Sequence, residues 1–384
     1  MNENLLRTDL VHGAAEVGPG RHGLAIHRLP AWLRGQFPEP QLMAMEAQPS
    51  GVRLAFVSEA EHISLISHPS RVVYLGVDRP RGSIDVTVDG RLHMRDPLTG
   101  GDRFEIDMQR GAQLFVEGTP HMSEITMPPG RKHIELWLPH NEALELIELR
   151  ANAKLETSAS EERQPRWLHH GSSISQGSNA PGPTDIWPVS VARTAGVWLQ
   201  NLGFGGSALV DPIVARMIRD TPADLITLKL GINVVNHDAM RLRAFVPAVH
   251  GFLDTIRDGH PETPIVLISP IFCGIHESTP GPGGIDPSSF ETGTPKFLVS
   301  GDPADVPAGK LTLEVIRTAL ASIVEARKAD TQLHYLDGLE LFGAADAEEF
   351  PLPDNLHPDA GGHARIAARF GERVFAAEGL FPTA

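Results

Sequence analysis

The chain has 384 residues, of which 41% are hydrophobic and 21% are charged, as is usual for a globular protein. Single hydrophobic cores stop growing near ~250–300 residues, so we expect two domains. The formal net charge of -15 disfavours nucleic acid and anionic membranes as partners.

Three further features of the chain limit the classes of protein to which it can belong. The single cysteine, Cys273, excludes a disulfide framework and a cysteine-based zinc site. No apolar run approaches the ~20 residues that are needed to span a bilayer. The first residues lack the basic-then-apolar layout of a secretory signal, so we expect a cytoplasmic protein.

The first part of the chain has the period-2 alternation of β-strands, interrupted by Pro- and Gly-containing turns. Asp89-Gly90 favours a type I′ hairpin turn between two of the strands. This pattern predicts an all-β sandwich or jelly-roll domain over residues 1–155. The candidate strands are 52–58, 62–68, 72–78, 84–90 and 133–139.

From Arg166 onward, strand patterns alternate with helical patterns, after a polar connection at 151–165. The alternation predicts an α/β domain with a parallel sheet over residues 156–384, whose ligands bind at the carboxyl ends of the strands. The candidate strands are 166–170, 197–202, 224–230, 264–272 and 332–337. The candidate helices are 187–196, 241–259, 311–329 and 360–378.

A Gly-Ser-Ser string, 171–173, follows the first strand of the α/β half directly. A serine at this point lies at the carboxyl end of the strand, where the start of a helix can offer N–H donors to an oxyanion. Taken alone the signal is weak, because Gly-Ser-Ser is a common loop string.

Polar residues after three other strands strengthen this signal. Gly206 follows the second strand and could offer a free backbone amide, while Asn233 follows the third and can donate from its side chain. Asp354 and His357 follow the fifth strand and precede the last helix. In such a pair the acid can orient the imidazole, and the imidazole can take the proton of a serine. All of them follow strand ends on one edge of the predicted sheet, which indicates a serine acyl-transfer site.

These sequence blocks resemble those of the SGNH, or GDSL-type, hydrolases over about residues 165–378. The resemblance implies a flavodoxin-like three-layer fold in which Ser173, His357 and Asp354 form the catalytic triad. It also implies that Ser173, Gly206 and Asn233 form the oxyanion hole, and that no metal or cofactor takes part. An acyl-Ser173 intermediate would then pass its acyl group to water or to a hydroxyl.

Two positions depart from the family's usual pattern. Ser172 stands where an Asp usually precedes the nucleophile, and Val234 stands where an Asp commonly follows the Asn. The serine leaves Ser173 as the expected nucleophile, and we expect the valine to alter the hydrogen bonds beneath the site without removing activity.

The two-part organisation resembles certain carbohydrate esterases and a type of acyltransferase that decorates aromatic polyketides with groups such as salicylyl. We therefore expect an acyltransferase of antibiotic-type biosynthesis, with a small-molecule ester or thioester as donor and a hydroxyl of a small natural product as acceptor. One alternative is a carbohydrate or small-molecule esterase. Another is a glycan-binding protein whose hydrolase domain is inactive. A phosphoesterase would need a metal cluster, and the sequence shows no such spacing.

Several other residues have open interpretations. Trp187 is either a core residue or a wall of the substrate pocket, and its nearness to Ser173 in the sequence favours the wall. The Gly- and Pro-rich segment 273–310 is either a lid over the site or a solvated insertion. His169 and His170 are expected to pack inside the domain.

Overall fold

A computed structural model describes residues 4–77, 79–107, 110–158, 163–292 and 295–383. Its contacts divide the chain into two units. One comprises Met1–Ala31, Met43–Gln164 and Pro181–Thr184, and the other comprises Trp32–Leu42, Pro165–Ala180 and Asp185–Ala384. The first unit continues to Gln164, past the expected boundary after residue 155, and Trp32–Leu42 groups with the second unit.

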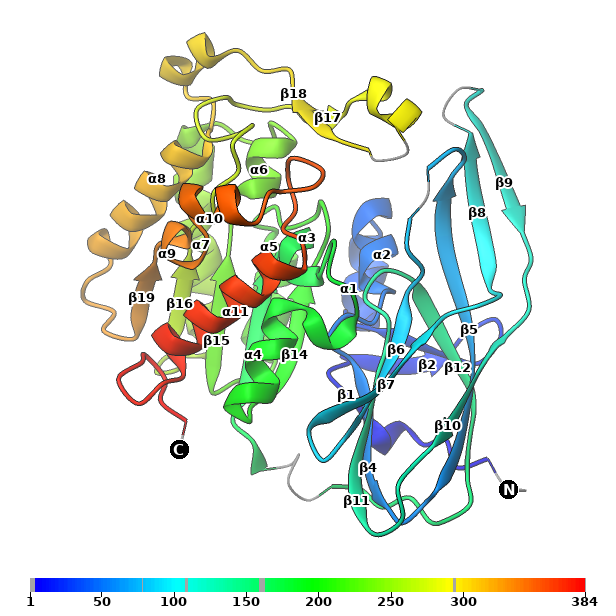
Figure 1. Ribbon diagram of the computed structural model, residues 1–384. Coiled ribbons are helices and arrows are strands. Elements are labelled where there is room, and N and C mark those ends of the chain that lie inside the picture. Colours follow the sequence, from blue (N-terminus) through cyan, green and yellow to red (C-terminus); the bar gives the residue numbers. More distant parts are fainter. Residues whose placement is uncertain (1–3, 78, 108–109, 159–162, 293–294, 384) are drawn as a thin grey trace. The chain divides into compact units, whose positions relative to one another are not determined.

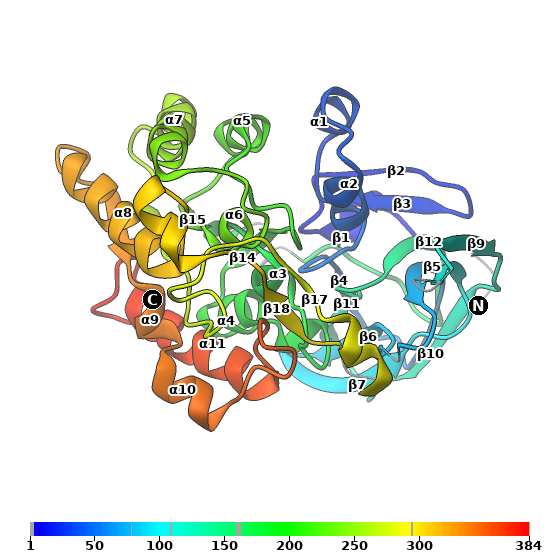
Figure 2. The ribbon, with the colours of Figure 1, turned by 90° about the horizontal axis from the view of Figure 1, so that it is seen from above.

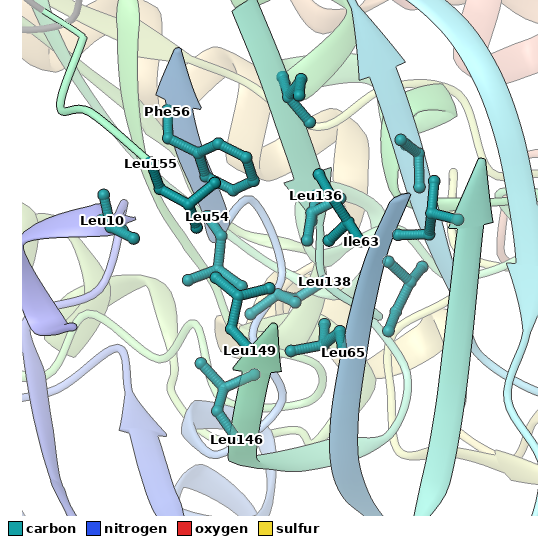
Figure 3. Packing of buried hydrophobic residues seen from close by; sticks show 14 of the residues in the cluster. Leu10, Leu54, Phe56, Ile63, Leu65, Leu136, Leu138, Leu146, Leu149 and Leu155 are labelled. Atoms are coloured by element: carbon teal, nitrogen blue, oxygen red, sulfur yellow. The ribbon is translucent and has the colours of Figure 1, made fainter. Parts of the chain in front are cut away.

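The first unit is a sandwich of two sheets, as predicted. One sheet has the order β1 (Val11–His12), β4 (Arg53–Ser58), β11 (Lys132–Trp137), β6 (Ser83–Val88) and β7 (Arg91–Pro97). The other has the order β2 (Glu16–Pro19), β3 (Leu24–His27), β12 (Ala143–Ala151), β5 (His62–Tyr74), β8 (Asp102–Asp107) and β9 (Ala112–Val116), and β10 (His121–Thr126) also pairs with β5. Buried side chains of both sheets, among them Phe56, Leu136, Leu65 and Leu149, form one core (Figure 3).

The sequence explains two features of the sandwich, the turn between β6 and β7 and the proline within β5. Asp89 and Gly90 have φ values of 48° and 76°, which confirms the type I′ turn between β6 and β7. The prediction of separate strands at 62–68 and 72–78 is wrong, because β5 runs through Pro69 from His62 to Tyr74. Pro69 lies where β5 exchanges β10 for β8 as its neighbour, a point at which its missing N–H is tolerated.

The second unit contains a parallel sheet of the order β14 (Trp198–Gly203), β13 (Arg166–Gly171), β15 (Leu225–Lys229), β16 (Ile265–Ile268) and β19 (Leu333–Leu336) (Figure 1). Helices α4 (Trp187–Ala195) and α11 (Ala360–Val374) cover one face. Helices α5 (Pro212–Asp220), α7 (Leu242–Gly259) and α8 (Leu313–Ala326) cover the other (Figure 2). This arrangement confirms the predicted three-layer α/β fold.

Short helices complete the structure. Two of them, α3 (Ser173–Gln176) and α6 (Ile232–Asn236), begin directly after β13 and β15 at the carboxyl edge of the sheet. The others are α1 (Ala31–Gln36), α2 (Pro40–Glu46), α9 (Gly338–Leu341) and α10 (Ala344–Glu349). Within the described residues, no helix combines the length and the apolar character that crossing a membrane requires.

Candidate active site

The structure brings Ser173, His357 and Asp354 into one chain of hydrogen bonds. Ser173 is the first residue of α3, and Ser172 caps that helix by accepting the Ile174 N–H at 3.4 Å. The Ser173 Oγ lies 2.8 Å from His357 Nε2, and His357 Nδ1 lies 2.7 Å from Asp354 Oδ2. This is the geometry in which an imidazole can take the proton of a serine hydroxyl while a carboxylate fixes its tautomer.

The loop before α11 holds the acid and the imidazole in place. Asp354 Oδ1 accepts the backbone N–H groups of Leu356 at 3.0 Å and His357 at 2.7 Å. Burial raises the pKa of the Asp354 carboxyl, but the bonds and charge of His357 and these N–H groups outweigh it, so the pKa lies below its ordinary value. Asp354 therefore stays ionised and can stabilise a protonated His357.

Three N–H donors lie at the carboxyl ends of neighbouring strands. They are the Ser173 N–H after β13, the Gly206 N–H after β14 and the Asn233 side-chain amide after β15. Within the part of the chain that the structure describes, none of these N–H groups donates to a protein acceptor. Donors left unpaired beside a nucleophile can stabilise the oxyanion of a tetrahedral intermediate.

The loop after β14 is shaped by its own hydrogen bonds. Gly206 has a φ of +71°, a conformation that favours glycine. Gly205 donates its N–H to Gln176 Oε1 at 2.7 Å, and Ala208 donates its N–H to Asn233 Oδ1 at 3.1 Å. Because the Asn233 oxygen is occupied in this way, its NH₂ group faces away from Ala208. Gln176 was not singled out from the sequence, although it follows Ser173 by only three positions.

A buried network lies beneath the nucleophile. His169 contacts Ser175 Oγ through Nε2 at 2.7 Å and Thr227 Oγ1 through Nδ1 at 2.7 Å. Burial, followed by the charges of His170 and Lys229, holds the pKa of His169 well below its ordinary value. His169 is therefore neutral and packs inside the domain, and Ser175 serves this network.

Trp187 belongs to the same core. Its side chain is 0% exposed, and its ring packs edge-on against His169 at 4.7 Å and beside Phe370 at 5.1 Å. This position contradicts the expectation that Trp187 lines a substrate pocket. Closeness to Ser173 in the sequence misled that prediction, because α4 turns its first residue into the layer between the sheet and α11.

Part of the 273–310 segment borders the catalytic loop. It forms a hairpin of β17 (Gly283–Ile285) and β18 (Phe297–Val299), while residues 293–294 fall outside the described ranges. Phe297 donates its N–H to Asp354 O at 2.8 Å, and its ring meets the His357 ring edge-on at 5.5 Å. These contacts favour the lid or rim over the solvated insertion. The Gly- and Pro-rich composition gave no sign that Phe297 was the contact residue.

One group of three potential metal ligands occurs among the described residues, and it lies in the sandwich. The ligand atoms of His22, His68 and Asp102 are all within 4.8 Å of one another. The two imidazole rings stack 3.6 Å apart with 14° between their planes, and both Nε2 atoms face the Asp102 carboxylate. An imidazole binds a metal in its own plane, so parallel stacked rings do not direct both lone pairs at one ion. We assign this group as a carboxylate shared by two imidazoles.

The comparison with protein families covers the region that holds these site residues. The model of the GDSL-like lipase/acylhydrolase family matches residues 170–365, about half of the chain. The chain belongs to this family. Ser173, Gly206, Asn233, Asp354 and His357 all lie within the matched residues.

Solved structures extend the similarity of this family member to the N-terminal sandwich. The salicylyl-acyltransferase SsfX3 from a tetracycline biosynthetic pathway matches with a TM-score of 0.76 and 30% identity, over 97% of this chain and 96% of that chain. A protein from Bacteroides ovatus described as a GDSL-like lipase matches with a TM-score of 0.66 and 19% identity, over 94% and 93%.

A family two carbohydrate esterase from Clostridium thermocellum, in complex with cellohexaose, shares the fold more distantly. Its TM-score is 0.54 at 14% identity, over 84% of this chain and 91% of that chain. No curated protein matches the sequence. With the family and the N-terminal β unit established, this chain is an enzyme of the acyl-transfer or esterase type.

Proposed function

We propose that this enzyme is a serine acyltransferase that moves an acyl group from an ester or thioester donor to a hydroxyl of a small natural product. The hydrogen-bonded chain from Ser173 to Asp354 carries the proposal of an acyl-Ser173 intermediate. Similarity to a salicylyl-acyltransferase over almost the whole length of both chains supports transfer to an acceptor of the aromatic polyketide type.

The first half of the reaction acylates the enzyme. His357 Nε2 takes the proton of the Ser173 hydroxyl as Oγ attacks the carbonyl carbon of the donor. The Ser173 and Gly206 N–H groups and the Asn233 amide hold the oxyanion of the tetrahedral intermediate. The intermediate then collapses and expels the alcohol or thiol of the acyl donor, which receives the proton from His357. The acyl group remains on Ser173 as an ester.

The second half transfers the acyl group. The acceptor hydroxyl gives its proton to His357 and attacks the same carbonyl carbon. The same three N–H groups hold the oxyanion of this second tetrahedral intermediate. Collapse of this intermediate returns the proton to Ser173 and releases the acylated product. If water replaces the acceptor, the same residues catalyse ester hydrolysis, which is the alternative that the fold shared with carbohydrate esterases supports.

The acceptor decides between these two outcomes. We would supply the enzyme with aryl and short-chain esters and thioesters, with and without polyphenolic or glycosylated acceptors, and follow products by mass spectrometry. Transfer predicts that an acceptor forms acyl product faster than water forms free acid. Release of free acid at one rate, whatever acceptor is added, would make the protein an esterase. If no substrate is turned over and a covalent serine probe labels no serine of the protein, the alternative of an inactive, glycan-binding protein is favoured.

A further inference from the structure

We infer that Gln41 is a positioning residue of the oxyanion hole. Its side chain holds the Gly205–Gly206 peptide group so that the Gly206 N–H is presented to the oxyanion. The inference rests on the proposed function, because it assigns a task to a residue behind one of the proposed donors.

Gln41 comes from the N-terminal half of the sequence but belongs to the α/β unit. The segment Trp32–Leu42 lies between strands of the sandwich in the chain, yet its contacts place it with the catalytic fold. Arg216 of α5 lies over the Trp32 ring at 4.9 Å and donates to Gln36 Oε1 at 3.3 Å. These contacts hold the segment against α5, which follows the loop that contains Gly206.

The hydrogen bond of Gln41 falls on the peptide group that carries the donor. Gln41 Nε2 donates to the Gly205 carbonyl oxygen at 2.9 Å. In a planar trans peptide the C=O of one residue and the N–H of the next point in opposite directions. Fixing the Gly205 carbonyl therefore fixes the direction of the Gly206 N–H, which has no protein acceptor in the described residues.

This peptide group needs such support because it joins two glycines. Without side chains, the peptide plane between Gly205 and Gly206 can rotate at low cost. Gln176 fixes the preceding peptide group by accepting the Gly205 N–H, and Gln41 fixes the Gly205–Gly206 peptide group itself through its carbonyl oxygen. A methyl group placed on Gly206 would lie 3.3 Å from Gln41 Nε2, so the glutamine amide lies directly against the turn.

The start of α2 fixes the backbone of Gln41 itself. The Glu39 carboxylate accepts the N–H of Gln41 at 3.1 Å and that of Leu42 at 2.6 Å. These two bonds satisfy N–H groups that the first turn of a helix leaves unpaired. The Gln41 side chain therefore starts from an ordered backbone, and little freedom has to be lost when it binds Gly205.

The test compares two substitutions of Gln41 on an ester that the native enzyme turns over. Gln41→Leu removes the donated hydrogen bond, and we expect kcat to fall about 3- to 10-fold with little change in KM, because the oxyanion forms only during reaction. Gln41→Glu keeps the shape of the side chain but places a carboxylate oxygen against the Gly205 oxygen. Its kcat should therefore fall further, by about 10- to 100-fold. A packing role alone predicts the reverse order.

Binding of a trifluoromethyl ketone supplies the second readout. Such a ketone adds to the serine and leaves an oxyanion in the hole, so its affinity should fall by the same factor as kcat in each variant. Gln36→Leu, on the same segment, is the matched control. It removes only the exposed 3.3 Å bond from Arg216 and leaves Arg216 over the Trp32 ring, so kcat, KM and this affinity should stay unchanged.

The outcomes separate this inference from the proposed function. If Ser173→Ala is inactive and both Gln41 variants keep native kcat and native ketone affinity, the role of Gln41 is wrong and the serine mechanism stands. An equal loss in Gln36→Leu would also overturn the inference, because it would show a general effect of the segment. If Ser173→Ala keeps native turnover, the proposed function itself fails.

Discussion

The two ends of the Asn233 side-chain amide have different roles: the oxygen is part of the loop structure, and the NH₂ group is a proposed donor to the oxyanion. Its oxygen accepts the Ala208 N–H at 3.1 Å, which ties the end of the Gly206 loop to α6. Its NH₂ group donates to no protein acceptor among the described residues. At the scale of single residues, one amide can therefore brace a loop and offer a donor to the oxyanion.

Substitution at Asn233 separates these two contributions. Asn233→Ala loses both, so we expect kcat to fall about 10²–10³-fold and the free energy of unfolding to fall by about 1 kcal/mol. Asn233→Asp keeps an oxygen for Ala208 but places negative charge where the oxyanion forms. Its kcat should fall at least as far, while its resistance to urea stays closer to native. An Asn233→Asp enzyme with more than a tenth of native kcat would contradict the assigned role.

At the scale of elements, α2 and α5 bring two acidic residues together. Asp211 precedes α5, and Glu39 caps α2. Burial and then the negative charge of Glu39 raise the pKa of the Asp211 carboxyl from 3.8 to about 6. The Asp211 carboxyl binds its proton more tightly in the folded state than in the unfolded state. The stability that this protonated carboxyl contributes is therefore fully present below pH 3.8 and is lost as the pH rises through about 6.

The variant Asp211→Asn should remove this loss. We expect it to be more stable than the native protein at pH 8, by about 1–2 kcal/mol after allowance for solvent screening, and equal to it at pH 4. Urea unfolding at the two pH values measures the difference. The same gain at both pH values would show that repulsion from Glu39 is not its source.

At the scale of the whole molecule, the sequence predicted the two-part architecture and the residues that gather at Ser173. The reason is physical, because each of these residues directly follows a strand of a parallel sheet or precedes its last helix. Strand ends can be read from local hydrophobic patterns, and parallel topology brings them to one edge. The approach of Asp354 and His357 to Ser173 follows from that topology.

Contacts between distant segments could not be predicted in this way. Gln41 lies in the N-terminal half without any local motif, and its bond to Gly205 depends on Trp32–Leu42 packing with the α/β unit. Phe297 lies in a segment whose composition indicates only loops. Trp187 shows the opposite error, since closeness in sequence to Ser173 does not determine whether a side chain faces a pocket or the core.

The most direct test of the account is to locate the acyl group on the enzyme. The native enzyme would be mixed with an activated ester, quenched in acid, digested and sequenced by mass spectrometry. We predict that the acyl mass lies on Ser173 and not on Ser172 or Ser175, and that Ser173→Ala carries none and has no turnover. Acylation of another residue, or native turnover in Ser173→Ala, would contradict the account.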